Sequence, residues 1–163
     1  MAIILYCRNG HNLSTYDPIY IGSPTHRQVI AMAEQSRRDS HAPRQPFCTE
    51  CGAPTLDACP HCGSKIARGP MPLHCGQCDK PFPWTEVALS AAHEYADDLD
   101  LSPEEKSTLK AVCDDLTVDT PRTGLAMDRF NMFMRKIGPV AADVLKKIIV
   151  DVITEAAKKG IGL

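Results

Sequence analysis

Eight residues in the first half of the chain have the side chains and the spacing of metal ligands. They form four pairs, Cys7-x3-His11, Cys48-x2-Cys51, Cys59-x2-Cys62 and Cys75-x2-Cys78. Two residues between two cysteines let both sulfur atoms reach one ion at about 2.3 Å. Glycine follows two of these pairs and readily adopts the positive φ that such turns often need. Because four pairs fill two tetrahedral sites, the pattern predicts two Zn²⁺ ions.

The pairs can be assigned to the two ions in two ways. The favoured assignment follows the order along the chain and places Cys7, His11, Cys48 and Cys51 on one ion and Cys59, Cys62, Cys75 and Cys78 on the other. The twelve residues between Cys62 and Cys75 suit a ribbon hairpin, which supports this assignment. The competing assignment places Cys48 to Cys62 on one ion and combines Cys7 and His11 with Cys75 and Cys78. Spacing alone does not separate the two.

His11 is the ligand that needs its own argument, since a lone histidine is more often a surface residue. It follows the tight turn expected at Asn9 and Gly10, and it supplies the eighth ligand that two ions require. His61 and His74 lie beside complete cysteine pairs and are expected on the surface.

The segment Cys-Pro-His-Cys at residues 59–62 also has the spacing of a thiol redox centre. Such a centre places its first cysteine at the start of a helix, where the helix N-terminus lowers the pKa of the thiol. Here Gly63 and Pro70 follow, and neither residue propagates a helix. A redox centre would also leave three neighbouring pairs unexplained, so zinc is the favoured interpretation.

The apolar run after Met1 is five residues long, has no basic residue before it and is expected to form a strand. It is too short for a membrane span and lacks the features of a secretory signal. The expected compartment is therefore the cytoplasm, where thiols stay reduced and paired cysteines more often hold metal than form disulfides.

The two halves of the chain differ in composition. Residues 1–84 hold seven of the eight cysteines and 8 basic against 6 acidic residues, whereas residues 85–163 hold 10 basic against 14 acidic residues. We expect two domains: a double zinc-ribbon module at 1–83 and a helical module of about four helices at 84–163. An inserted loop or short helix is expected at 13–46, where Arg27, Arg37, Arg38 and Arg44 cluster.

Helix signals are explicit in the second half. Val87, Leu89 and other apolar residues recur along a helix that begins near Trp84. Ser102 and Glu105 predict a capping box with Pro103 as the first helical residue. Thr120 and Pro121 repeat the device for a helix that ends at Ile137, with apolar anchors at Leu125, Met127, Phe130, Phe133 and Met134.

One further helix is predicted from Pro139 to about Lys159. Its apolar residues form two adjacent rows, Val140, Val144, Ile148 and Val152 in one and Ala141, Leu145, Ile149 and Ile153 in the other. Its longest apolar run is far too short for a membrane span. The fold class expected is α+β, a small zinc-ribbon β-hairpin module followed by an all-α module. Because so few residues bury a limited share of their surface, this last helix is also a candidate for self-association.

The chain resembles a family of short bacterial proteins, domain of unknown function 2321. The resemblance rests on "CRNGH", "FCTECGAPT", "CPHC", "PFPWTE" and "DTPRT", and it covers most of the chain outside residues 13–46. One departure is Asp79, which follows Cys78 where glycine is expected. The resemblance implies a zinc-ribbon head and a helical tail and implies no activity.

These observations predict a non-enzymatic zinc-binding protein that acts as a macromolecular adaptor through protein–protein interaction and self-association. No phosphate-binding loop and no nucleophile with its base is evident, and sites with four protein ligands leave no position for a reacting water. Trp84 and Arg122 are candidate partner contacts; the alternatives are internal packing for Trp84 and a surface charge for Arg122.

Two other functions are considered. One is nucleic-acid binding, which the net charge of +2 over residues 1–84 does not favour, since phosphate binding needs a concentrated basic face. The other is a redox sensor or oxidoreductase in which Cys59 and Cys62 release zinc on oxidation.

Overall fold

The computed structural model describes residues 5–13, 46–67 and 70–162. The chain divides into two compact units, Met1–Met71 and Pro72–Leu163. Residues 14–45 of the predicted insertion, with its four arginines, lie outside the described residues. The sequence-based domain boundary between residues 83 and 84 is a prediction of where two independently folding domains meet, and it stays a prediction.

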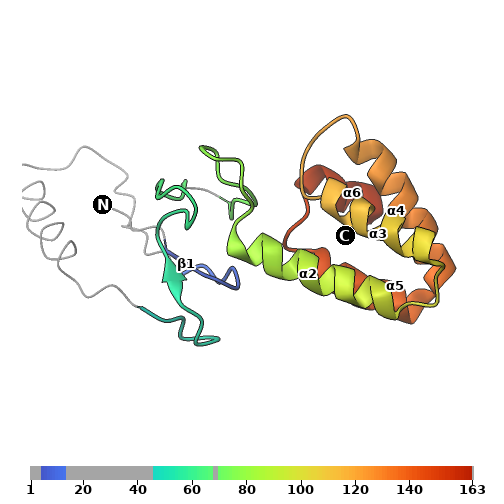
Figure 1. The fold of residues 1–163 in the computed structure, drawn as a ribbon, viewed down its shortest axis with the longest axis horizontal. Coiled ribbons are helices and arrows are strands. Elements are labelled where there is room, and N and C mark those ends of the chain that lie inside the picture. The colour runs from blue at the N-terminus through green and yellow to red at the C-terminus, as the bar shows by residue number, and fades with distance from the viewer. Residues whose placement is uncertain (1–4, 14–45, 68–69, 163) are drawn as a thin grey trace, which may run out of the picture. The chain divides into compact units, whose positions relative to one another are not determined.

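The first unit contains a minimal antiparallel sheet. Strand β1 (Tyr6–Cys7) pairs antiparallel with β2 (Thr55–Leu56); β1 is labelled in Figure 1. Cys7 lies opposite Thr55 in the ladder. Isolated bridges close the turns on either side, at Tyr6 with Asn12, Phe47 with Pro54 and Ala58 with Lys65. The sheet therefore brings the first ligand pair beside the segment that follows the second pair.

Few apolar side chains are buried in the described part of this unit. Among its described residues the buried ones are Leu5, Tyr6, Cys7, Cys48, Cys59 and Ile66. Three of the six are cysteines of the predicted metal sites. These six side chains alone supply little hydrophobic stabilisation, and small domains with few buried apolar residues commonly depend on a metal or disulfides.

The second unit is helical. Its helices are α2 (Pro83–Asp98), α3 (Pro103–Asp115), α4 (Thr123–Ile137), α5 (Pro139–Ile149) and α6 (Glu155–Ile161). Helix α4 contacts α3, α5 and α6, while α2 contacts α3 and α5. With the small sheet of the first unit, these helices make an α+β fold, as the sequence predicts.

The helix signals read from the sequence succeed best at α3. Ser102 Oγ accepts a hydrogen bond from the amide of Glu105 at 3.3 Å, and the Glu105 carboxylate accepts one from the amide of Ser102 at 3.1 Å. This reciprocal pair satisfies two amides at the helix start, and Pro103 needs no partner there. The predicted capping box is therefore confirmed.

The predicted start of α4 is wrong by two residues. The helix begins at Thr123 rather than at Pro121, and Thr120 instead forms a turn before it. The Thr120 amide donates to Thr123 Oγ1 at 2.9 Å, and that hydroxyl donates in turn to the carbonyl of Val118 at 2.8 Å. These bonds of the buried Thr123 side chain hold the preceding residues in a turn.

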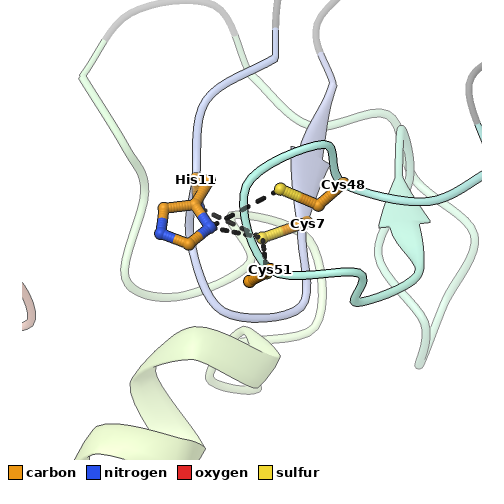
Figure 2. A group of neighbouring side chains, drawn as sticks. All are labelled: Cys7, His11, Cys48 and Cys51. Atoms are coloured by element: carbon orange, nitrogen blue, oxygen red, sulfur yellow. Dashed lines mark hydrogen bonds between the residues drawn. The ribbon is translucent and has the colours of Figure 1, made fainter.

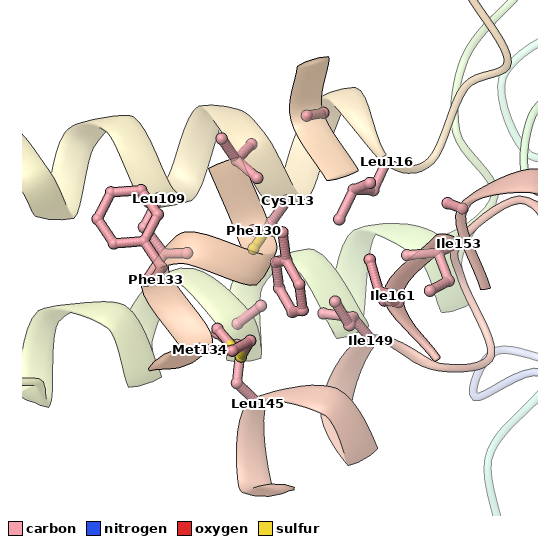
Figure 3. Close-up of a cluster of buried hydrophobic side chains, with 14 of the residues drawn as sticks. Leu109, Cys113, Leu116, Phe130, Phe133, Met134, Leu145, Ile149, Ile153 and Ile161 are labelled. Atoms are coloured by element: carbon pink, nitrogen blue, oxygen red, sulfur yellow. The ribbon is translucent and has the colours of Figure 1, made fainter. Parts of the chain in front are cut away.

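The core of the second unit surrounds α4 (Figure 3). Phe130 is fully buried, with contributions from every other helix of the unit around it. The largest fully buried side chains of this core are Leu109, Leu116, Phe130, Leu145 and Ile149. Cys113 also lies in it, and burial raises the pKa of its thiol to about 12, so it behaves as a small apolar residue, as expected.

The predicted single helix from Pro139 to about Lys159 is wrong, because the chain forms two helices there. Helix α5 ends at Ile149, and Thr154 starts α6 by accepting a hydrogen bond from the amide of Ala157 at 3.2 Å. The Thr154 amide donates to the carbonyl of Leu116 at 3.1 Å, which fixes the break. Helix α6 can then turn back onto α4.

Several apolar residues expected in the core are exposed. Val87 of α2 and Leu125 of α4 are 54% and 50% exposed, and Val140 of α5 is 79% exposed. Helix α5 buries Ala142, Leu145 and Ile149 instead of the row that begins at Val140. None of the helices in the described part of the chain combines the length and hydropathy that crossing a bilayer requires.

Candidate metal centres

The three Cys-x2-Cys segments form the same backbone turn. The amide of the residue after the second cysteine donates to the carbonyl of the first at 2.9 Å, from Gly52 to Cys48, Gly63 to Cys59 and Asp79 to Cys75. The amide of the first cysteine donates at 2.8–2.9 Å to a carbonyl five residues on, from Cys48 to Ala53, Cys59 to Ser64 and Cys75 to Lys80. Each turn thus places two sulfur atoms on one side of a short loop.

Asp79 adopts the conformation that glycine adopts in the other two turns. Its φ is 58°, compared with 70° at Gly52 and 73° at Gly63. The departure from glycine noted in the sequence therefore leaves the form of the turn intact. It places an L-residue in the left-handed region, where steric contacts of the Cβ atom raise the energy.

In the Cys7–His11 turn the backbone hydrogen bonds span one residue fewer than in the Cys-x2-Cys turns, although the two ligands are one residue further apart. The Cys7 amide donates to the carbonyl of His11 at 3.0 Å, and the Gly10 amide donates to the carbonyl of Cys7 at 2.9 Å. Gly10 provides the positive φ, 88°. The second ligand thus comes directly after the glycine, whereas in the cysteine pairs it comes directly before the residue of positive φ.

The four side chains of the first group point toward one another (Figure 2). His11 Nδ1 lies 3.5 Å from Cys7 Sγ and 3.6 Å from Cys48 Sγ, and Cys7 Sγ lies 3.8 Å from Cys51 Sγ. A tetrahedral zinc ion with ordinary bond lengths separates two sulfur ligands by about 3.8 Å and a sulfur and a nitrogen ligand by about 3.6 Å. All three distances match the edges of such a tetrahedron, and none of the described cysteines forms a disulfide.

Hydrogen bonds to the sulfur atoms favour the thiolate form that a metal needs. The backbone amide of Ala53 lowers the pKa of Cys51, whose side chain is exposed. His11 donates its backbone amide to Cys7 Sγ at 3.3 Å, although burial is the larger influence and raises the pKa of Cys7. A cation among the four ligands offsets this burial cost, because metal binding releases the thiol protons.

The second group is Cys59, Cys62, Cys75 and Cys78, whose sulfur atoms all lie within 4.8 Å of one another. Cys62 Sγ also lies 3.1 Å from the hydroxyl of Ser64. The structure therefore brings the eight residues together in the two groups of the favoured assignment. Both groups have the composition and spacing to hold metal ions. That the ions are zinc stays a prediction.

The segment at residues 59–62 lacks the structure of a redox centre. It forms the metal-type turn described above, and the described residues 59–67 contain no helix. A helix N-terminus that could activate Cys59 is thus not present in this segment.

Trp84 and Arg122 differ in their accessibility. The Trp84 side chain is 3% exposed, stacks on Phe82 with ring centroids 4.7 Å apart, and donates through Nε1 to the carbonyl of Pro72 at 2.8 Å. Because it packs internally, we do not propose Trp84 as a partner contact. The Arg122 side chain is 70% exposed and forms a 3.1 Å ion pair with Asp115.

Two residues near the first group were missed in the sequence. Asn9 Nδ2 donates to Cys51 Sγ at 3.5 Å, and Glu50 Oε2 lies 4.0 Å from His11 Nε2. Both stand between the two ligands of a pair, a position that could have indicated a role beside the metal.

A comparison with known protein families matches residues 25–161 to domain of unknown function 2321 (DUF2321), described as an uncharacterized protein conserved in bacteria. The chain belongs to this family. The predicted resemblance is thereby confirmed, and the DUF2321 match includes all three Cys-x2-Cys pairs, while Cys7 and His11 precede it. No curated protein and no solved structure matches the chain.

Proposed function

We propose that the protein is a non-enzymatic adaptor in which two zinc ions hold the Cys-rich segments in shape and the helical unit self-associates. The observation that carries the proposal is the completeness of both ligand groups. Each supplies four protein ligands, which is typical of structural zinc and leaves no coordination position for substrate or water. Three cysteines with one histidine, and four cysteines, are both common ligand sets for structural zinc.

The small apolar core in the described part of the first unit supports a structural role for the metal. Segments that bury so few large side chains gain much of their folding free energy from a bound ion. Zinc removal should therefore unfold these segments while the second unit, which has its own core, keeps its helices.

Exposed apolar side chains on α4 and α5 support self-association. Val140 and Val144 lie one turn apart on α5 and are 79% and 38% exposed, and Leu125 and Met132 lie two turns apart on α4 and are 50% and 57% exposed. Water contact with these side chains is unfavourable, and a second copy that covers them would remove the cost. We expect the helical unit to form a dimer through the face of α5 that carries Val140 and Val144.

Sedimentation velocity of the full chain tests the dimer. The double variant Val140→Asp with Val144→Asp should sediment as a monomer at a concentration where the unaltered chain is dimeric. Val87→Asp is the matched control, since Val87 is also an exposed valine but lies on α2. An unaltered chain that is monomeric at all concentrations would refute self-association, and loss of the dimer in the control would refute this choice of surface.

The structural role of the metal is tested by a chelator titration followed by circular dichroism and native mass spectrometry. We expect two zinc ions in the starting protein, and after their removal a loss of order in the Cys-rich segments with the helical signal largely retained. A protein that turns over a substrate with the metal in place would contradict the non-enzymatic assignment.

A further inference from the structure

The two turns that form the first metal group each extend a polar side chain to the other. Asn9, from the Cys7–His11 turn, donates its amide to Cys51 Sγ at 3.5 Å. Glu50, from the Cys48–Cys51 turn, places its carboxylate 4.0 Å from His11 Nε2. In both directions the contact reaches the second ligand of the opposite pair, across about forty residues of chain.

The two contacts are chemically suited to the ligands that they reach. Cys51 is the exposed thiol of the group, and an amide donor offsets the negative charge that builds on its sulfur atom as a thiolate. His11 faces the sulfur atoms through Nδ1, so its Nε2 is turned to the other side, where Glu50 lies. At 4.0 Å the Glu50 carboxylate lies beyond hydrogen-bond distance of His11 Nε2, but its negative charge favours the tautomer that carries a proton on that nitrogen and makes the imidazole a better ligand.

We propose that Asn9 and Glu50 are a reciprocal pair of positioning residues that tighten metal binding at the first site and leave the affinity of the second site unchanged. The inference rests on the proposed zinc-binding function. Removing such an outer contact typically weakens a metal site by about 10–100-fold. The second group has its own ligands and should be unaffected.

The test is a chelator titration of the full zinc-loaded chain, read as the number of ions retained by native mass spectrometry. Asn9→Leu removes the amide at nearly constant size, and Glu50→Gln removes the carboxylate charge. In each variant, one ion should leave at a chelator concentration about tenfold or more below that of the unaltered protein, while the other ion leaves at the usual concentration. Arg8→Gln and Thr49→Val alter the neighbouring positions of the same turns and should behave as the unaltered protein does.

A spectroscopic readout separates positioning from a general loss of structure. In the cobalt-substituted protein, Asn9→Leu should shift the sulfur-to-metal charge-transfer band of one site to lower energy, because the sulfur atom loses a hydrogen bond. Asn9→Asp provides a second variant; its carboxylate should repel the thiolate and weaken the first site more than leucine does.

The outcomes are distinct. If the unaltered chain binds no metal, the proposed function fails and this inference fails with it. If it binds two ions but all variants release both at the usual chelator concentration, or if the controls weaken the site equally, only this inference is overturned.

Discussion

Asp79 provides a sharp test of the structure because its backbone conformation is costly for any residue except glycine. Its φ of 58° matches those of Gly52 and Gly63, 70° and 73°, at the same position of the other turns. The left-handed region costs an L-residue about 1–2 kcal/mol, and aspartate lies near the lower end because its short side chain bonds locally. Glycine avoids this cost but loses about 0.5 kcal/mol more conformational entropy on folding.

These magnitudes predict a ranking of variants at position 79. Asp79→Gly should stabilise the turn by about 0.5 kcal/mol, the strain relieved minus the added entropy. Asp79→Ala should destabilise it by about 1 kcal/mol, because alanine lacks the local bonding of aspartate. Since the turn holds two ligands, the two variants should differ by about tenfold in apparent zinc affinity at the second site.

Competition with a chromophoric chelator measures that affinity, and native mass spectrometry identifies the ion count at each point. Lys80→Ala is the matched control, because Lys80 contributes to the turn through its backbone carbonyl, which accepts from the Cys75 amide at 2.9 Å. An alanine variant that binds zinc as tightly as the glycine variant would refute the reasoning from backbone strain.

Three further changes probe the helical unit. Phe130→Ala should destabilise it by about 3–5 kcal/mol, because the ring is fully buried, and urea unfolding followed by circular dichroism measures this; a loss below about 1 kcal/mol would contradict the core. The hydrogen bond from Lys136 lowers the pKa of Glu105 from 4.5, so the stabilisation that this pair gives is present above pH 4.5 and is lost as the pH falls through the lowered pKa. Lys136→Met should therefore make the decrease of Tm in acid less steep, and an unchanged decrease would refute the pair. Gly160→Ala should change the free energy of unfolding by less than about 1 kcal/mol in thermal unfolding, because the new Cβ meets only the flexible side chain of Met127, which can move, and alanine favours the helix; a loss above about 3 kcal/mol would show instead that Met127 is held rigidly between α6 and α4.

The metal-binding segments could be predicted from the sequence because their chemistry is local. A Cys-x2-Cys pair fixes its own turn through bonds between residues at most five apart, so the turns around Cys48, Cys59 and Cys75 follow from spacing alone. The assignment of pairs to ions depends on contacts between distant segments. The ladder between β1 and β2 places the Cys7 pair beside the Cys48 pair, and no local pattern reports that pairing.

The helical unit shows the same division. Ser102 and Glu105 mark the start of α3 because both partners of the cap are local. The break after Ile149 could not be predicted from the pattern, since it is fixed by the bond from Thr154 to the carbonyl of Leu116, far away in the sequence. The apolar rows continue through the break without interruption, because Val152 and Ile153 belong to the connection between α5 and α6 and are buried in the core.

Apolar periodicity also does not tell which residues of a helix are buried. A valine such as Val140 contributes to a helical pattern whether it faces the core or water, and its exposure is set by how α5 packs on α2 and α4. Trp84 is the opposite case, a residue considered as a partner contact that is buried. Its hydrogen bond to the carbonyl of Pro72 depends on the chain before the helix, which the helical pattern does not describe.

We propose that two complete ligand groups hold two zinc ions in this chain. Elemental analysis of freshly purified protein, combined with a count of free thiols, tests it most directly. We expect two equivalents of zinc per chain and no disulfide among the eight cysteines. Far less than two equivalents of metal, with the cysteines of the two groups oxidised to one another, would contradict it.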